Sequence, residues 1–268
     1  MANNDYVIRG GAPARERLHL VSEVMGTATS RLLTEVGISR GSRCLDLGCG
    51  GGDVTVKLAR RVGAAGHVLG IDRDEVQLKL ARQEAEEQQI ANVTFEARDV
   101  MTWQPNERFD VAYARFLLTH LAAPAALLTA VRPHLRPGGT IILEDIDFRG
   151  HFAEPGCRAL DRSVELYTQV VQNRGADPNI GPRLPGLLRA AGVTDVQMRL
   201  VHPAALQGGI KRLICVTLES IADAVLHDGL ASEAELRKTI DQLYAFAEDP
   251  HTVLGGPRVF QVWGRIGS

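Results

Sequence analysis

Residues 44–53, Cys-Leu-Asp-Leu-Gly-Cys-Gly-Gly-Gly-Asp, are the stretch that most constrains what this chain can fold into. A short apolar segment passes directly into glycines at alternate positions, and apolar residues then recur at helical spacing from Val54 to Val62. This order predicts a buried strand, a tight turn and a helix. Glycines let a ligand approach the backbone, and a helix N-terminus offers unpaired N–H groups. We therefore expect the turn to bind a ligand.

An acidic residue, Asp46, lies two positions before the first of these glycines. A carboxylate at the end of the strand suits a ligand with an ammonium group better than one with a pyrophosphate. The Asp-x-Gly-x-Gly-x-Gly pattern resembles motif I of the class I S-adenosylmethionine-dependent methyltransferases. In that family the acid and the glycine turn hold the methionine part of the cofactor. The resemblance implies a set of cofactor-binding residues here: Asp46, Gly48, Gly50 and Gly52.

The turn has two other interpretations, a dinucleotide-binding turn and a turn without a ligand. The nicotinamide dinucleotide fingerprint, Gly-x-Gly-x-x-Gly, would place its third glycine where this chain has Asp53, so its register does not fit. A glycine-rich turn without any ligand is the other interpretation, and the further features below disfavour it.

Two later strands are each expected to end in an acid that meets a nucleoside. Residues 67–72 form an apolar strand ending in Asp72, followed by Arg73, and a carboxylate there can accept both ribose hydroxyls. Both cofactor classes use such an acid, so Asp72 does not separate them. Residues 92–100 form the next strand, and the resemblance implies that Asp99 and the backbone of Val100 meet the adenine. Taken alone, an aspartate after a strand is more often a turn former.

The predicted fourth strand, 109–114, is followed by Arg115, which we expect to orient the cofactor or an anionic substrate. His120 comes five residues later among leucines, where a histidine is usually a core residue. Its segment resembles the corresponding region of small-molecule methyltransferases of the quinone-biosynthesis type, with Pro124 starting a helix. This resemblance makes His120 the first candidate for removing a proton from the methyl acceptor.

Acidic residues and a histidine follow the predicted fifth strand, 140–143. We expect a loop at residues 144–151 that faces the cofactor, in which His151 and then Asp147 are further candidates for proton removal. Without paired His or Cys spacing these acids make a poor metal site, so no catalytic metal is expected. The alternative is a solvated acidic loop whose carboxylates pair with an arginine.

The predicted fold class is α/β: a Rossmann-like, seven-stranded, mostly parallel sheet with an antiparallel last strand, helices on both faces and a helical cap insertion. A chain of 268 residues has room for this sheet and substantial insertions. Residues 1–39 are expected to form an N-terminal helical segment, in which residues 6–11 are either a lid over the cofactor or a frayed terminus. Residues 40–208 and 255–268 would form the core, and residues 209–254 a helical insertion that serves as a cap or subunit contact.

Composition limits the partners. A formal net charge of −2 and a pI near 6.5 argue against nucleic-acid binding. Four scattered cysteines without metal spacing suit a cytoplasmic protein, and no secretory signal or membrane span is expected. The predicted function is methyl transfer from S-adenosylmethionine to a small-molecule acceptor, by a protein that could be a homodimer. A cofactor-binding sensor or scaffold is the alternative, and a nicotinamide-dependent dehydrogenase a weaker one.

Overall fold

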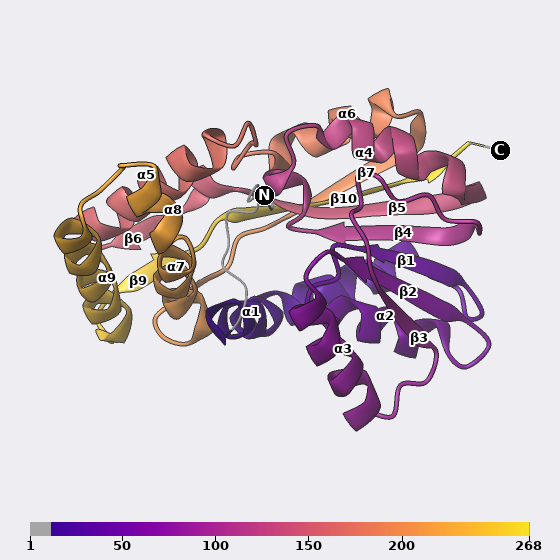
Figure 1. The fold of residues 1–268 in the computed structure, drawn as a ribbon, viewed down its shortest axis with the longest axis horizontal. Helices are drawn as coiled ribbons and strands as arrows, with labels where there is room; N and C mark the ends of the chain where they lie inside the picture. Colours follow the sequence, from indigo (N-terminus) through magenta and orange to yellow (C-terminus); the bar gives the residue numbers. More distant parts are fainter. Residues whose placement is uncertain (1–11, 268) are drawn as a thin grey trace.

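The computed structural model describes residues 12–267, with side chains from residue 16 onward, so the lid expected at residues 6–11 lies outside the described residues. Its centre is a seven-stranded sheet in the order β3-β2-β1-β4-β5-β10-β7 (Figure 1). The last strand, β10, pairs antiparallel with β5 and β7, whereas β1 to β5 pair parallel with one another, as the sequence predicted. The strands are β1 (Arg43–Leu47), β2 (His67–Asp72), β3 (Val93–Ala97), β4 (Phe109–Arg115), β5 (Leu135–Asp147), β7 (Val193–Val201) and β10 (Arg258–Ile266).

Helices cover both faces of the sheet (Figure 1). One face packs against α1 (Ala12–Val36), α2 (Asp53–Val62) and α3 (Glu75–Glu87). The other packs against α4 (Pro124–Val131) and α6 (Leu184–Ala190). Side chains alternate across β1 because successive strand residues point to opposite faces: Leu45 and Leu47 enter the core under α4 and α6, while Cys44 enters the one under α1 and α2.

The strand order fixes where a ligand can bind. β1 pairs with β2 on one side and with β4 on the other. The chain runs from β1 outward to β2 and from β4 outward to β5, so the connections that follow β1 and β4 diverge between the carboxyl ends of these two strands. In open α/β sheets the crevice at such a switch point takes the ligand. The turn after Leu47 opens at this crevice.

A second group of helices lies at one end of the sheet (Figure 1). It comprises α5 (Arg158–Gln172), α7 (Gly209–Ser220), α8 (Ala222–His227) and α9 (Glu233–Glu248), which share one apolar cluster. The insertion proposed for 209–254 therefore packs with α5, which our division assigned to the core. A three-stranded sheet, β6 (Phe152–Glu154), β9 (Val253–Gly255) and β8 (Ala204–Ala205), joins this group to the rest of the chain.

One sequence expectation about the fifth strand is wrong. β5 continues to Asp147 because Arg258 to Arg265 of β10 pair with it residue by residue, so Glu144 and Asp145 lie in a strand and not in a loop. Both side chains are almost fully buried, which also rules out a solvated acidic loop. In the part of the chain that the structure describes, no helix has the length and apolar character needed to cross a membrane.

Candidate active site

The turn after β1 has the backbone conformation that its glycines predict. Gly48 and Gly50 both have positive φ values, +66° and +50°. The Gly50 N–H donates a hydrogen bond to Asp72 Oδ2 at 2.9 Å, which ties the turn to the end of β2. Asp72 Oδ1 accepts a second bond from the Asp74 N–H, also at 2.9 Å. The Asp72 carboxylate is thus fixed at the mouth of the turn.

A cavity of about 470 Å³ opens at this turn, along the carboxyl ends of β1, β2 and β4. It brings together residues that are far apart in the sequence and that we had proposed separately. Those in its wall are Asp46, Gly48, Gly50, Asp72, Arg73, Asp99, Val100, Arg115 and His120.

Gly52 is the one proposed cofactor residue that is absent from the cavity wall. It has a φ of +79° and precedes α2, and a Cβ built on it would lie 2.9 Å from Ala81 Cβ and 3.1 Å from the Phe95 ring. The structure therefore places this glycine at the tight contact between the turn, α3 and β3.

Asp46 is buried at the floor of the cavity, where its Oδ2 accepts a 2.6 Å hydrogen bond from the Thr55 hydroxyl. Burial raises the pKa of Asp46 to about 7, although the Thr55 hydrogen bond and the Arg115 charge oppose that rise. The carboxyl is thus close to half protonated at neutral pH, and a cation placed beside it would favour its ionised form.

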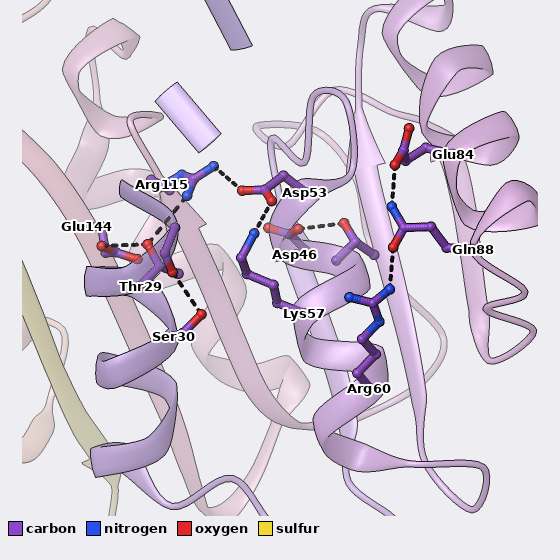
Figure 2. Close-up of polar contacts among 12 residues, drawn as sticks. Thr29, Ser30, Asp46, Asp53, Lys57, Arg60, Glu84, Gln88, Arg115 and Glu144 are labelled. Atoms are coloured by element: carbon purple, nitrogen blue, oxygen red, sulfur yellow. Dashed lines mark hydrogen bonds and ion pairs between the residues drawn. The ribbon is translucent and has the colours of Figure 1, made fainter. Parts of the chain in front are cut away.

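Arg115 is held in place by groups from two helices, α1 and α2 (Figure 2). Its guanidinium pairs with Asp53 Oδ2 at 3.0 Å and lies 3.4 Å from the Thr29 hydroxyl of α1. Asp53 also pairs with Lys57 on the next turn of α2. These contacts orient Arg115 before any ligand is bound, and its side chain is only 10% exposed.

A buried carboxylate, Glu144, lies behind Arg115 (Figure 2). It accepts hydrogen bonds from the Thr29 hydroxyl at 3.2 Å, from Gln261 Nε2 at 2.7 Å and from the Tyr113 hydroxyl. Since these donors come from α1, β10 and β4, Glu144 fixes the elements around the cavity relative to one another. The carboxyl itself is absent from the cavity wall.

Among the polar wall residues that the sequence analysis did not assign to the site, two carry buried donors without a described partner. Gln77 on α3 is 4% exposed, and its Nε2 has no hydrogen-bond partner among the described residues; the same holds for Arg17 Nε on α1. Buried donors without partners are rare in folded proteins, so two of them in one cavity point to a polar ligand. No sequence signal marked them, because each is one of several polar positions along its helix.

The three candidates for proton removal are not brought together. His120 lies in the cavity wall, and burial followed by the charges of Arg17 and Arg73 lowers its pKa to about 3. His151 lines a second, smaller cavity next to the first. Asp147 lines neither of these cavities; its buried carboxylate pairs with Arg149 at 2.8 Å and with Arg258 at 2.7 Å.

The match to a known family decides what kind of protein carries this cavity. A family model described as a methyltransferase domain matches residues 38–178, over half of the 268-residue chain. The chain belongs to the class I S-adenosylmethionine-dependent methyltransferases. The matched segment contains β1 to β5 and nearly the whole cavity wall.

Individual relatives of this methyltransferase differ in how much of it they cover. It is 29% identical to the trans-aconitate 2-methyltransferase of Variovorax paradoxus over 86% of its own length and 90% of that protein. The ubiquinone biosynthesis O-methyltransferase of Acinetobacter baylyi is 32% identical, over 40% of this chain and only 44% of that protein. A solved structure from Bacillus halodurans C-125 shares the fold, with a TM-score of 0.62 at 19% identity over 90% of this chain and 100% of the other.

Family membership argues against the alternative functions that the sequence left open. The cofactor of this methyltransferase is S-adenosylmethionine, so a nicotinamide-dependent dehydrogenase is not supported, and a sensor or scaffold without methyl transfer is not favoured. The residues present suit the cofactor: an open turn with positive φ at Gly48 and Gly50, carboxylates at the ends of β1 and β2, and the unpartnered Gln77 donor.

Proposed function

We propose that this methyltransferase transfers a methyl group directly to a small-molecule acceptor, in the cavity at the carboxyl ends of β1, β2 and β4. The observation that carries the proposal is the Asp72 carboxylate, fixed by Gly50 and Asp74 at the mouth of a glycine turn that a bulky side chain would block. When bound, S-adenosylmethionine supplies a methyl group already activated on a sulfonium. The protein then has to orient the two reactants and exclude water.

Each proposed cofactor residue has a definite task. Asp46 and the turn at Gly48 and Gly50 would receive the methionine part, because a carboxylate close to half protonated becomes fully ionised beside an ammonium group. Asp72, next to Arg73, would accept the ribose hydroxyls. Asp99 and the Val100 backbone would face the adenine at the far end of the same wall.

Arg115 would hold the carboxylate of the methionine part, because its guanidinium is already oriented by Asp53 and Thr29. Gly52 has a different task in this proposal: it lets α2, α3 and β3 pack closely behind the turn. We therefore expect Gly52 to affect folding more than cofactor contact.

His120 and His151 are the two residues that we propose for receiving a proton from the acceptor. Both rings are neutral at pH 7, since burial lowers the pKa of His120 to about 3 and that of His151 to about 4. The charges of Arg17 and Arg73 contribute to the lower pKa of His120, which makes it the weaker base of the two. We leave Asp147 out of this set, because two arginines already neutralise it away from both cavities.

The remaining parts of the proposal concern the setting of the reaction. A cytoplasmic location agrees with four free cysteines. A homodimer, and the absence of nucleic acid or membrane among the partners, stay predictions that sedimentation and binding assays can check.

Transfer of a trideuterated methyl group from labelled S-adenosylmethionine to small acceptors, followed by mass spectrometry, tests this function. We expect a product 17 mass units above the acceptor, as a CD₃ group replaces one hydrogen. With Asp72→Ala, product should form about 5–150-fold more slowly at subsaturating cofactor, since unpaired ribose hydroxyls cost about 1–3 kcal/mol. Glu75→Ala is the matched control, because Glu75 lies on the exposed surface of α3. Binding of the cofactor without transfer to any hydroxy, amino or carbon acceptor would instead support a sensor.

A further inference from the structure

Glu144 lies within the central sheet, on the face that α1 covers. It is the cross-strand partner of Arg115 on β4 and of Gln261 on β10, so these two side chains flank it on the same face of the sheet. Its side chain is buried, with 0% of its surface exposed. A buried carboxylate is costly unless hydrogen bonds and an opposite charge compensate it. Arg115, in the adjacent position, is the cation that can do so.

The side-chain oxygens of Glu144 accept hydrogen bonds from three neutral groups. Oε2 accepts from the Thr29 hydroxyl at 3.2 Å and from Gln261 Nε2 at 2.7 Å, and Oε1 accepts from the Tyr113 hydroxyl. An ionised carboxylate can only accept, so the hydrogen of the Thr29 hydroxyl has to point at Glu144. The lone pairs of that hydroxyl are then left for a donor on its other side.

Arg115 supplies this donor. Its Nη1 lies 3.4 Å from Thr29 Oγ1, and its Nη2 pairs with Asp53 Oδ2 at 3.0 Å (Figure 2). The Thr29 hydroxyl is thus a bridge between Arg115 and the buried charge of Glu144. Burial on its own would lower the pKa of Arg115, but the charges around it, among them Glu144 and Asp53, raise it. The guanidinium is therefore held from two sides, and it lines the cofactor cavity.

We propose that Thr29 and Glu144 are positioning residues for cofactor binding: through the Thr29 hydroxyl, Glu144 holds Arg115 in the orientation in which it receives the carboxylate of the methionine part. Both residues are absent from the cavity wall, so they act through Arg115 and not by touching the cofactor. The inference rests on the proposed function, in which Arg115 binds that carboxylate. A donor that is already ordered binds a charged group more tightly than one that has to be immobilised on binding.

Calorimetric titration with two ligands separates this role from a merely structural one. S-adenosylhomocysteine carries the carboxylate, whereas its decarboxylated analogue keeps the ammonium group and lacks only the carboxylate. Thr29→Val removes the bridging hydroxyl, so it should weaken binding of S-adenosylhomocysteine by about 3–10-fold and change the affinity for the analogue by less than about twofold. Thr29→Ser keeps the hydroxyl and should retain full affinity for both ligands. Thr239→Val, at a buried threonine of α9, is the matched control and should change neither affinity.

Glu144→Gln tests the other end of the bridge. The amide has no charge, and its NH₂ group competes with the donors that Glu144 accepts, so this variant should also weaken binding of S-adenosylhomocysteine selectively. Combined with Thr29→Val, it should cost less than the sum of the two single effects, because both act through Arg115. Should Glu144→Gln fail to fold, the Thr29 variants alone decide.

Three results would overturn the inference: full affinity for S-adenosylhomocysteine in Thr29→Val, equal weakening of both ligands by that variant, or equal losses in Thr29→Val and Thr29→Ser. Failure of the unmodified protein to bind S-adenosylhomocysteine would instead contradict the proposed function.

Discussion

At the scale of single residues, spacing located the acids of the cofactor cavity but not the polar helix residues opposite them. Asp46 and Asp72 could be predicted because each ends a recognisable strand, and the ends of parallel strands meet at one edge of a sheet. Arg17 and Gln77 could not, because one polar side chain in an amphipathic helix does not reveal which way it faces. His151 was predicted in a loop near the cofactor, but the structure places it in the wall of the second, smaller cavity.

The raised pKa of Asp46 leads to a pH dependence of cofactor binding. Burial raises this pKa to about 7 in the free protein, and a bound ammonium group would favour the ionised carboxylate. Binding should then release a proton below pH 7, so the affinity for S-adenosylhomocysteine should rise by up to about tenfold per pH unit toward pH 7 and level off above it. Calorimetry between pH 5.5 and 8 measures this slope. In Asp46→Asn the slope should disappear, and an unchanged slope would mean that another group takes up the proton.

At the scale of elements, strands and helices followed from periodicity, and the errors arose where pairing partners are distant. The helix over 158–172 and the strand over 193–201 have the predicted bounds. β5 is longer than predicted, because its extension depends on pairing with β10, which comes more than a hundred residues later. The small sheet of β6, β8 and β9 was missed, since strands of two or three residues carry no periodic signal.

The glycine turn gives a prediction about packing. Gly52→Ala should lower the free energy of unfolding by about 1–3 kcal/mol more than Gly138→Ala does. Both glycines have similar positive φ values, +79° and +76°, so both variants carry backbone strain. Only at position 52 would the new Cβ also meet side chains, Ala81 Cβ at 2.9 Å and the Phe95 ring at 3.1 Å, whereas nothing lies within 4 Å at Gly138. Urea denaturation measures both, and equal losses would show that α3 moves aside without cost.

At the scale of the whole molecule, the fold brings three separate parts of the chain to one place. The sheet supplies the acids and the glycine turn, α1 supplies Arg17 and Val21, and α7 supplies Ile214. The sequence predicted the sheet and its topology from motifs, and it predicted helices over 209–248. It did not predict that α7 would line a smaller cavity that shares wall residues with the cofactor cavity, since this depends on how α1 packs against α7.

The central claim is that S-adenosylmethionine binds at the turn between β1 and α2, with Asp72 as a direct contact. Calorimetric titration with S-adenosylhomocysteine tests it most directly. We expect one site per chain, no binding of NAD under the same conditions, about 5–150-fold weaker binding to Asp72→Ala, and no change in Glu75→Ala. A folded protein that binds NAD instead, or that binds S-adenosylhomocysteine equally well with and without the Asp72 carboxylate, would contradict this account.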